Sequence, residues 1–167
     1  MATGQMTGGG SGVSAWPSEP HSCGTEFDPA DGWQLDSLLD IAGLPSSVAA
    51  TRRYIRQLLG DWGLDDLKDH AELLVSELTT NAVVASAELA VGGPIQLRVL
   101  SDKARIAILV SDVNPRPPVR LEAGGDSEGG RGLALVDALS DQWGWFPRMD
   151  RPGKVVWCVI QPGGLGQ

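Results

Sequence analysis

The chain has 167 residues, 42% of them hydrophobic, which is enough for one packed core and too few residues for two ordinary domains with a linker. Its formal net charge of −8 makes a nucleic-acid duplex or an anionic membrane an unfavourable partner. No lysine or arginine precedes Arg52, and this opening stretch carries −6 of the −8. The remainder is nearly balanced and is therefore compatible with an anionic ligand.

Cysteine usage and the start of the chain bear on its location. Cys23 and Cys158 give neither a disulfide framework nor the spacing of metal ligands. The first residues lack the basic and apolar regions of a signal peptide, and no apolar run reaches membrane-spanning length. These features predict a cytoplasmic protein with no nucleic acid and no membrane among its partners.

Composition divides the chain into two parts. Residues 1–30 are dominated by Gly, Ser, Thr, Pro and Glu, which bury too little apolar surface to offset the entropy lost on ordering. We therefore predict a disordered leader over 1–30, dispensable for folding, and one folded domain over 31–163.

The first half of the domain is predicted to contain one strand and two helices. Residues 33–41 fit either a strand or a helix, and their short length favours a strand. A helix is predicted from a serine N-cap at 46–47 to a stop at Gly60. The longest helix is predicted from about residue 65 to 87. Its apolar face consists of Leu67, Ala71, Leu74, Val75, Leu78, Ala82 and Ala85.

The second half is predicted to contain two hairpins separated by a lid and a helix. Apolar residues alternate from Ile95, which predicts a strand that turns at 101–103 into a second strand over 104–110. The Pro- and Gly-rich stretch 113–130 is typical of a functional lid or a disordered segment. A helix follows from Arg131 to about Ser140, and strands 143–149 and 155–161 flank a Pro-Gly turn.

The long helix carries the first candidate site residues. Glu77 and Asn81 are one helical turn apart on the border of its apolar face, so their side chains project together. An asparagine oxygen suits Mg²⁺, and a neighbouring glutamate can act as a general base. An ordinary solvated helix border would show the same pair.

Further candidates lie at the two ends of the lid. Gly129 to Gly132 precede or open a helix, where backbone N–H groups can approach a phosphate, and Arg116, Arg120 and Arg131 could neutralise its charge. A glycine-rich turn without any ligand has the same composition. Asp112 ends an apolar run, so its carboxylate could accept hydrogen bonds from an amino group or simply form an Asx turn.

Taken in order, these motifs resemble those of the Bergerat-fold ATPases, the GHKL group that includes gyrase, histidine kinases and MutL. Residues 74–83 (LVSELTTNAV) resemble the N box. Residues 110–118 resemble a degenerate first glycine box, and residues 130–136 resemble the second. Residues 141–144 and 153–157 are similar to the small single-domain branch, the bacterial anti-sigma-factor serine/threonine kinase type. The resemblance covers about residues 33–161.

The resemblance implies an α/β sandwich (α+β), with helices on one face of a mixed, mostly antiparallel sheet and ATP between the helices and a lid. Carried over by position, Asn81 would bind Mg²⁺, Glu77 would be the general base and Asp112 would recognise the adenine amino group. The remaining nucleotide contacts would be Arg116, Gly130, Arg131, Gly132 and Leu133. Asn114 and Arg116 depart from the family pattern because glycines usually stand there, and Ala85 replaces a frequent histidine.

The implied activity is an ATP- and Mg²⁺-dependent serine/threonine protein kinase that regulates by partner switching. Its implied partners are an anti-sigma antagonist protein, a sigma factor or both, and a homodimer is one option for its assembly. No histidine-containing dimerisation helix precedes the domain, which disfavours an autophosphorylating histidine kinase. The alternative is a non-catalytic ATP-sensing interaction module; Glu77 favours the kinase, and the altered first glycine box favours the module. An α/β domain without nucleotide would require the ordered motifs to be coincidental.

Overall fold

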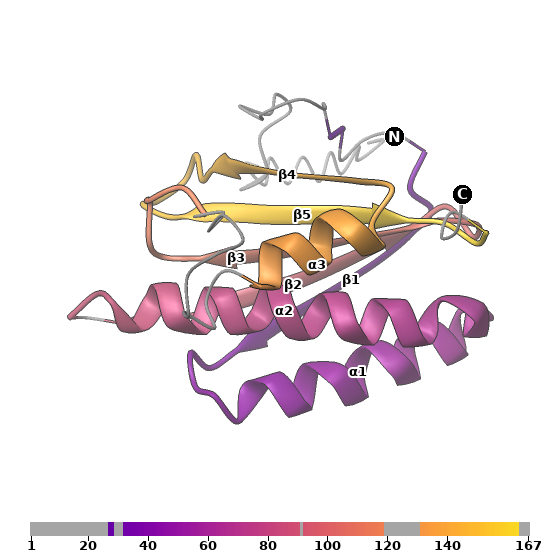
Figure 1. Ribbon diagram of the computed structural model, residues 1–167, viewed down its shortest axis with the longest axis horizontal. Helices are drawn as coiled ribbons and strands as arrows, with labels where there is room; N and C mark the ends of the chain where they lie inside the picture. Colours follow the sequence, from indigo (N-terminus) through magenta and orange to yellow (C-terminus); the bar gives the residue numbers. More distant parts are fainter. Residues whose placement is uncertain (1–26, 29–31, 91, 119–130, 164–167) are drawn as a thin grey trace, which may run out of the picture.

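The computed structural model describes residues 27–28, 32–90, 92–118 and 131–163, which form one layer of helices on one sheet (Figure 1). The elements in chain order are β1 (Leu35–Ile41), α1 (Ser47–Asp61), the short 3₁₀ helix η1 (Asp65–Leu67), α2 (Lys68–Ala87), β2 (Ile95–Ser101), β3 (Ile106–Asp112), α3 (Arg131–Leu139), β4 (Gln142–Pro147) and β5 (Lys154–Ile160). The predicted order of strands and helices is confirmed.

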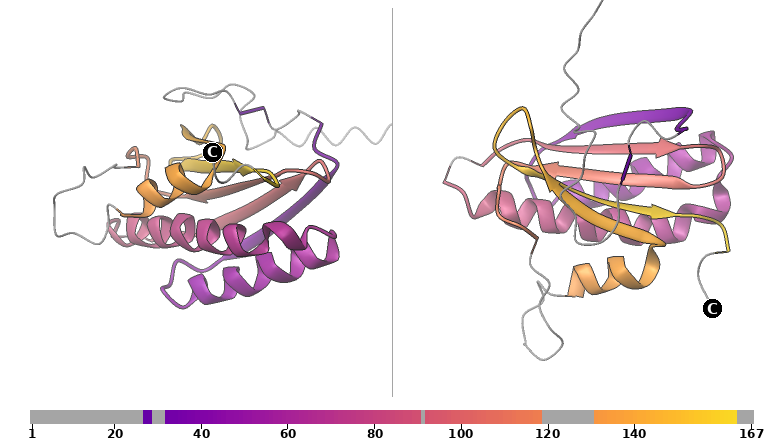
Figure 2. Two further views of the ribbon diagram at one scale, coloured as in Figure 1. Left: turned by 45° about the vertical axis from the view of Figure 1, so that its right-hand side comes forward. Right: turned by 90° about the horizontal axis from the view of Figure 1, so that it is seen from above.

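The five strands form one sheet in the order β1-β2-β3-β5-β4. All four pairs of neighbouring strands described are antiparallel, so the expected mostly antiparallel sheet is present and none of these pairs is parallel. The helices lie on one face of the sheet, with α2 packed along its centre, α1 against the outer side of α2 and α3 beside α2 under β4 (Figure 2). The predicted α+β sandwich is confirmed.

The larger core fills the space between the sheet and the helices. Strands contribute every second residue to it, as the period of a pleated strand requires. Its buried members from the strands are Ile41, Ile95, Leu97, Val99, Ile106, Ile108, Val110, Val156, Cys158 and Ile160. On α2 and η1, the predicted apolar face is buried at Leu67, Ala71, Leu74, Val75, Leu78 and Ala82, and only Ala85 is partly exposed at its end.

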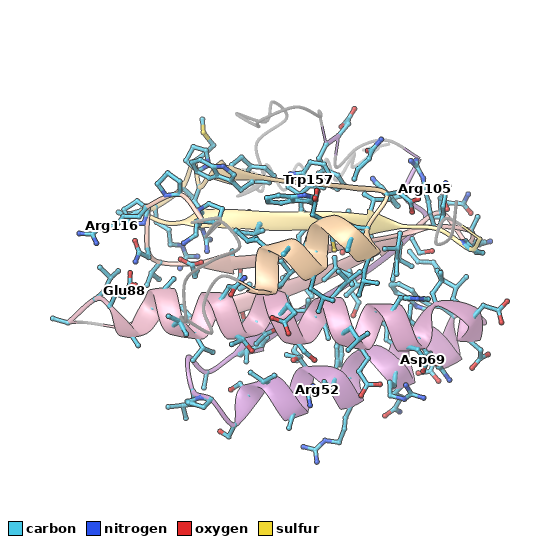
Figure 3. All side chains as sticks on the ribbon, in the orientation of Figure 1. Arg52, Asp69, Glu88, Arg105, Arg116 and Trp157 are labelled. Atoms are coloured by element: carbon cyan, nitrogen blue, oxygen red, sulfur yellow. The ribbon has the colours of Figure 1, made fainter. Side chains whose placement is uncertain are left out.

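A smaller core covers the opposite face of the sheet and corrects one predicted boundary. The side chains of β3, β4 and β5 that point away from the helices gather around Trp157, which Figure 3 labels on that face. Phe27 packs on Trp157 with ring centroids 5.0 Å apart and is only 4% exposed. Trp33 packs against the same cluster. Phe27 therefore belongs to the folded domain, although the composition of residues 1–30 placed it in the leader.

This boundary leads to a test by truncation. A chain that begins at Phe27 should melt at nearly the temperature of the full chain, because residues 1–26 offer few apolar side chains for a core. A chain that begins at residue 29 loses the buried Phe27 ring and should be less stable by about 3 kcal/mol. Thermal unfolding of the two truncations checks this difference. Equal melting temperatures would contradict the assignment of Phe27 to the core.

The ends of α1 differ in detail from the prediction. Ser46 is the N-cap residue but makes no side-chain cap bond, while the Ser47 hydroxyl donates to the Ala42 carbonyl at 2.7 Å. The helix continues past Gly60 to Asp61, and the left-handed residue is Gly63 with φ +72°. The chain reverses at Gly63 because glycine adopts positive φ without a Cβ clash.

Candidate functional site

Helix α2 brings Glu77 and Asn81 to the edge of the core, as the four-residue spacing predicted. Both residues are partly buried, because the stripe that faces the sheet lies directly beside them. No described residue hydrogen-bonds or forms an ion pair with either side chain. The carboxylate of Glu77 and the amide of Asn81 are therefore available to a ligand or to water.

Strand β3 ends at Asp112, whose side chain is almost completely buried at 2% exposure. Its Oδ1 accepts a hydrogen bond from the Asn114 backbone N–H at 2.8 Å, which is the Asx turn that the sequence allowed as one interpretation of this residue. The same oxygen accepts from Lys154 Nζ at 3.0 Å. The carboxylate thus closes a turn and forms a buried ion pair at the same time.

Lys154 is a site residue that the sequence did not single out. It begins β5 directly opposite Asp112 in the antiparallel register of β3 and β5, and it is only 4% exposed. Its ammonium group also donates to the Asn114 carbonyl at 3.1 Å. The sequence contains one signal for this residue: a single lysine begins a run of apolar residues. Such a lysine is expected to be buried, and a buried ammonium group needs a partner.

Asn114, one of the two departures from the glycine pattern, connects the first lid residues to helix α2. Its Nδ2 donates to the Ala85 carbonyl at 2.9 Å and to Glu88 Oε2 at 3.1 Å. Its Oδ1 accepts from the Arg116 backbone N–H at 3.0 Å. Figure 3 shows Glu88 and Arg116 at the same end of the molecule. Glycine could make none of these side-chain bonds. The chain after Asp112 is therefore held against α2 at positions where the family usually has flexible glycines.

Burial and charge act in opposite directions on Asp112. Burial raises the pKa of this carboxyl group above its usual range, while the neighbouring Lys154 ammonium, its hydrogen bonds and Arg148 act to lower it. Burial is the larger effect, so the pKa remains raised. The ion pair with Lys154 therefore favours the ionised carboxylate and opposes the effect of burial.

These residues surround one cavity of about 490 Å³ between α2, the end of β3, the first lid residues and α3. Five of the eight predicted site residues line it: Glu77, Asn81, Asp112, Arg116 and Leu133. Arg131 and Gly132 are the first residues of α3, and Gly130 lies outside the described residues. The sequence did not predict Lys154, Asn114, Thr80 or Glu88 as part of this lining.

The lining of the cavity suits a nucleotide. Its volume lies in the range of small-molecule sites, and its walls are mainly apolar, from residues such as Val110, Leu133 and Val156. Its polar groups come from two sides, with Asp112 and its bonded neighbours Asn114 and Lys154 on one side and Glu77 and Asn81 on α2. The described residues contain no cluster of three or more histidine, cysteine, aspartate or glutamate side chains for a metal ion. A hard cation held by one amide oxygen and by phosphate oxygens of a ligand fits this donor set.

Comparison with known protein families matches residues 41–160 to the histidine kinase-like ATPase domain. The match runs from the last residue of β1 to the end of β5 and includes all of the site residues described above. The chain belongs to the histidine kinase-like ATPase family. Comparison with curated proteins gave no match.

Membership of the histidine kinase-like ATPase family agrees with the resemblance found in the sequence and implies that the domain binds ATP. The motifs predict a nucleotide site between the helices and the lid, and the cavity lies between α2 and the first lid residues. Among the helices described for this histidine kinase-like ATPase, none is long and apolar enough to cross a membrane.

Proposed function

We propose that this histidine kinase-like ATPase is an ATP- and Mg²⁺-dependent serine/threonine protein kinase that acts by partner switching. The observation that carries the proposal is the position of Glu77 and Asn81 on the wall of the cavity that also contains Asp112. A carboxylate, an amide oxygen and a buried acceptor then face one ligand from two elements. This set supplies a base, a metal ligand and a group that recognises the nucleobase.

Each residue has a distinct proposed role. Asp112 accepts a hydrogen bond from the adenine amino group, and the Asn81 amide oxygen is one ligand of Mg²⁺. Glu77 accepts the proton of the attacking serine hydroxyl. Arg116 and the beginning of α3 (Arg131, Gly132 and Leu133), with Gly130 before it, contact the nucleotide. ATP supplies the phosphoryl group, and Mg²⁺ neutralises the charge of its phosphates.

The proposed partners are those of the branch that the chain resembles: an anti-sigma antagonist protein that carries the acceptor serine, a sigma factor, or both. The motifs at 141–144 and 153–157 support this branch. The proposed compartment is the cytoplasm, which agrees with the free, fully buried thiol of Cys158.

A non-catalytic ATP-sensing module is the second candidate, and Asn114 favours it. Its bonds to Ala85 and Glu88 hold the first lid residues on α2, whereas phosphate transfer in a closed site commonly requires a lid that moves. The retained Glu77 favours the kinase, since nucleotide sensing alone needs no general base.

The first test concerns Mg²⁺. Replacing Asn81 with alanine removes the proposed protein ligand of the metal, so ATP affinity should lose its dependence on Mg²⁺. Titration calorimetry with and without Mg²⁺ measures this directly. Gln57→Ala serves as the matched control, because it removes an exposed carboxamide from α1, away from the cavity. Equal Mg²⁺ dependence in wild type and Asn81→Ala would contradict the metal site.

A further inference from the structure

The ion pair of Asp112 and Lys154 is a buried feature of the cavity to which the proposed catalytic steps assign no role. The side chain of Lys154 is 5% exposed and that of Asp112 is 2% exposed, and both residues line the cavity. Bringing two charges out of water is costly, and such a pair seldom stabilises a fold more than apolar residues would. Its presence at the nucleobase end of the cavity therefore calls for a function in recognition.

The two oxygens of Asp112 are not equivalent. Oδ1 is occupied by the Lys154 ammonium at 3.0 Å and the Asn114 backbone N–H at 2.8 Å. No described residue hydrogen-bonds to Oδ2. This second oxygen is therefore the one available to the base of a bound nucleotide.

Ionisation determines which base this oxygen can bind. An ionised carboxylate only accepts hydrogen bonds, whereas a protonated carboxyl group can also donate one. Adenine presents an amino group at position 6, and hypoxanthine and guanine present a carbonyl oxygen there. An ionised Asp112 thus matches adenine, and a protonated Asp112 matches a 6-oxopurine.

We propose that Lys154 is a specificity-determining residue: its ion pair holds Asp112 as a hydrogen-bond acceptor and thereby selects adenine over 6-oxopurines. The inference rests on the proposed ATP site, because it assigns Asp112 to the nucleobase. Lys154 acts through Asp112, so it is a positioning residue and takes no part in phosphate transfer.

The charges around Asp112 support this role of Lys154. Lys154 on β5 contacts the Asp112 carboxylate directly. Arg148, in the segment after β4, adds a weaker interaction that favours the ionised carboxylate, and its Nη1 donates to Ser111 Oγ at 3.2 Å. From the end of α2, Glu88 bonds to Asn114, which in turn bonds to Asp112. Arg148 is also paired with Asp150. Lys154 is therefore the main charge that opposes the effect of burial on the carboxyl group.

The ionisation of Asp112 also determines how ATP binding should depend on pH. Burial already raises the pKa of Asp112, and removing Lys154 would raise it further. Adenine binding needs the ionised form, so it is present above that pKa and is lost as the pH falls through it. Without Lys154 this loss begins at a higher pH.

The experiment compares ATP with inosine triphosphate in wild type and Lys154→Met, over about pH 5 to about pH 8. The two nucleotides share the triphosphate, so titration of the phosphates cancels in the ratio of their dissociation constants. Wild type should prefer ATP at the upper end of this range. In Lys154→Met the preference should fall by about tenfold to a hundredfold, the usual value of one hydrogen bond to a charged group, and it should fall further at lower pH.

Three controls separate charge from packing. Lys154→Arg keeps the charge and should keep the ATP preference, while Lys154→Gln loses the charge at similar size and should behave as Lys154→Met. The double variant Asp112→Asn, Lys154→Met has no titratable group at the pair, so its nucleotide ratio should not vary with pH. If Lys154→Met does not fold, as judged by thermal unfolding, the comparison of Lys154→Arg with Lys154→Gln gives the same answer.

The outcomes distinguish this inference from the function on which it rests. A wild-type protein that binds neither nucleotide would overturn the proposed ATP site. Wild type that prefers ATP, with an unchanged ratio and pH profile in Lys154→Met and Lys154→Gln, would overturn the role of Lys154 alone. A reduced ATP preference that recovers as the pH rises would support it, because a packing defect has no such pH dependence.

Discussion

Replacing Glu77 with glutamine should leave ATP binding intact and slow phosphate transfer by on the order of a hundredfold to ten-thousandfold. Glutamine keeps the shape of the side chain on the wall of the cavity but cannot accept the proton of a serine hydroxyl. Glu77 has no hydrogen-bond or ion-pair partner among the described residues, so the change breaks no structural contact that could account for a loss of activity. The predicted effect therefore falls on the chemical step.

The measurement is a single-turnover reaction with labelled ATP and a candidate partner that carries a serine, alongside calorimetry for ATP. Glu72→Gln is the matched control, because Glu72 lies on the same helix and pairs with Arg56 at 2.5 Å, outside the cavity. It should transfer phosphate at the wild-type rate. Undiminished transfer by Glu77→Gln would refute its assignment as the base, whereas wild type that transfers to no candidate partner would favour the interaction module.

Replacing Gly153 with alanine should cost about 3 kcal/mol or more of folding stability and disrupt the cavity wall at Asp112. Gly153 has φ +140°, and a Cβ placed there would lie 2.1 Å from the Asp112 carbonyl oxygen. The clash cannot be relieved by a side-chain rotation, because the obstacle is the backbone of β3. The Arg148 backbone N–H also donates to the Gly153 carbonyl at 2.9 Å, which holds the turn in place.

Gly63→Ala is the control for backbone strain alone. Gly63 has φ +72°, and no atom lies within 4 Å of the position that an alanine methyl group would take. Only the left-handed conformation is therefore penalised, by about 1–2 kcal/mol. Urea unfolding of the two variants measures the difference. If Gly153→Ala were no less stable than Gly63→Ala, the close approach of the turn to β3 would be refuted.

The elements that the sequence predicted well are those whose signal is local. Alternation at Ile95, Leu97 and Val99 reflects the two faces of a strand, and the long stripe on α2 reflects the helical period. Both patterns act over a few residues. The motifs around Asn81 and Asp112 added the arrangement of the helices on one face of the sheet, because a family pattern describes the whole domain.

The features that the sequence did not predict depend on contacts between distant segments. Lys154 pairs with Asp112, 42 residues away, only because β5 lies beside β3 in one particular register. Phe27 is buried only because Trp157 lies under it on the far face of the sheet. From the sequence, Asn114 is only a departure from the glycine pattern, because its bond to Ala85 requires the folded position of α2. Neither composition nor periodicity contains this information.

The position of β5 has a consequence for synthesis of the chain. It is the last of the described strands, yet it lies inside the sheet between β3 and β4 and supplies Lys154 and Val156 to the cavity. Until residues 154–160 have left the ribosome, the edge of β3 that faces β5 is unpaired, and β4 lacks the strand beside it in the described sheet. Since an unpaired strand edge invites association with other chains, the interval before β5 emerges is when a nascent chain is most exposed to misassembly. The cavity is complete only after that interval, because Lys154 and Val156 are part of its wall.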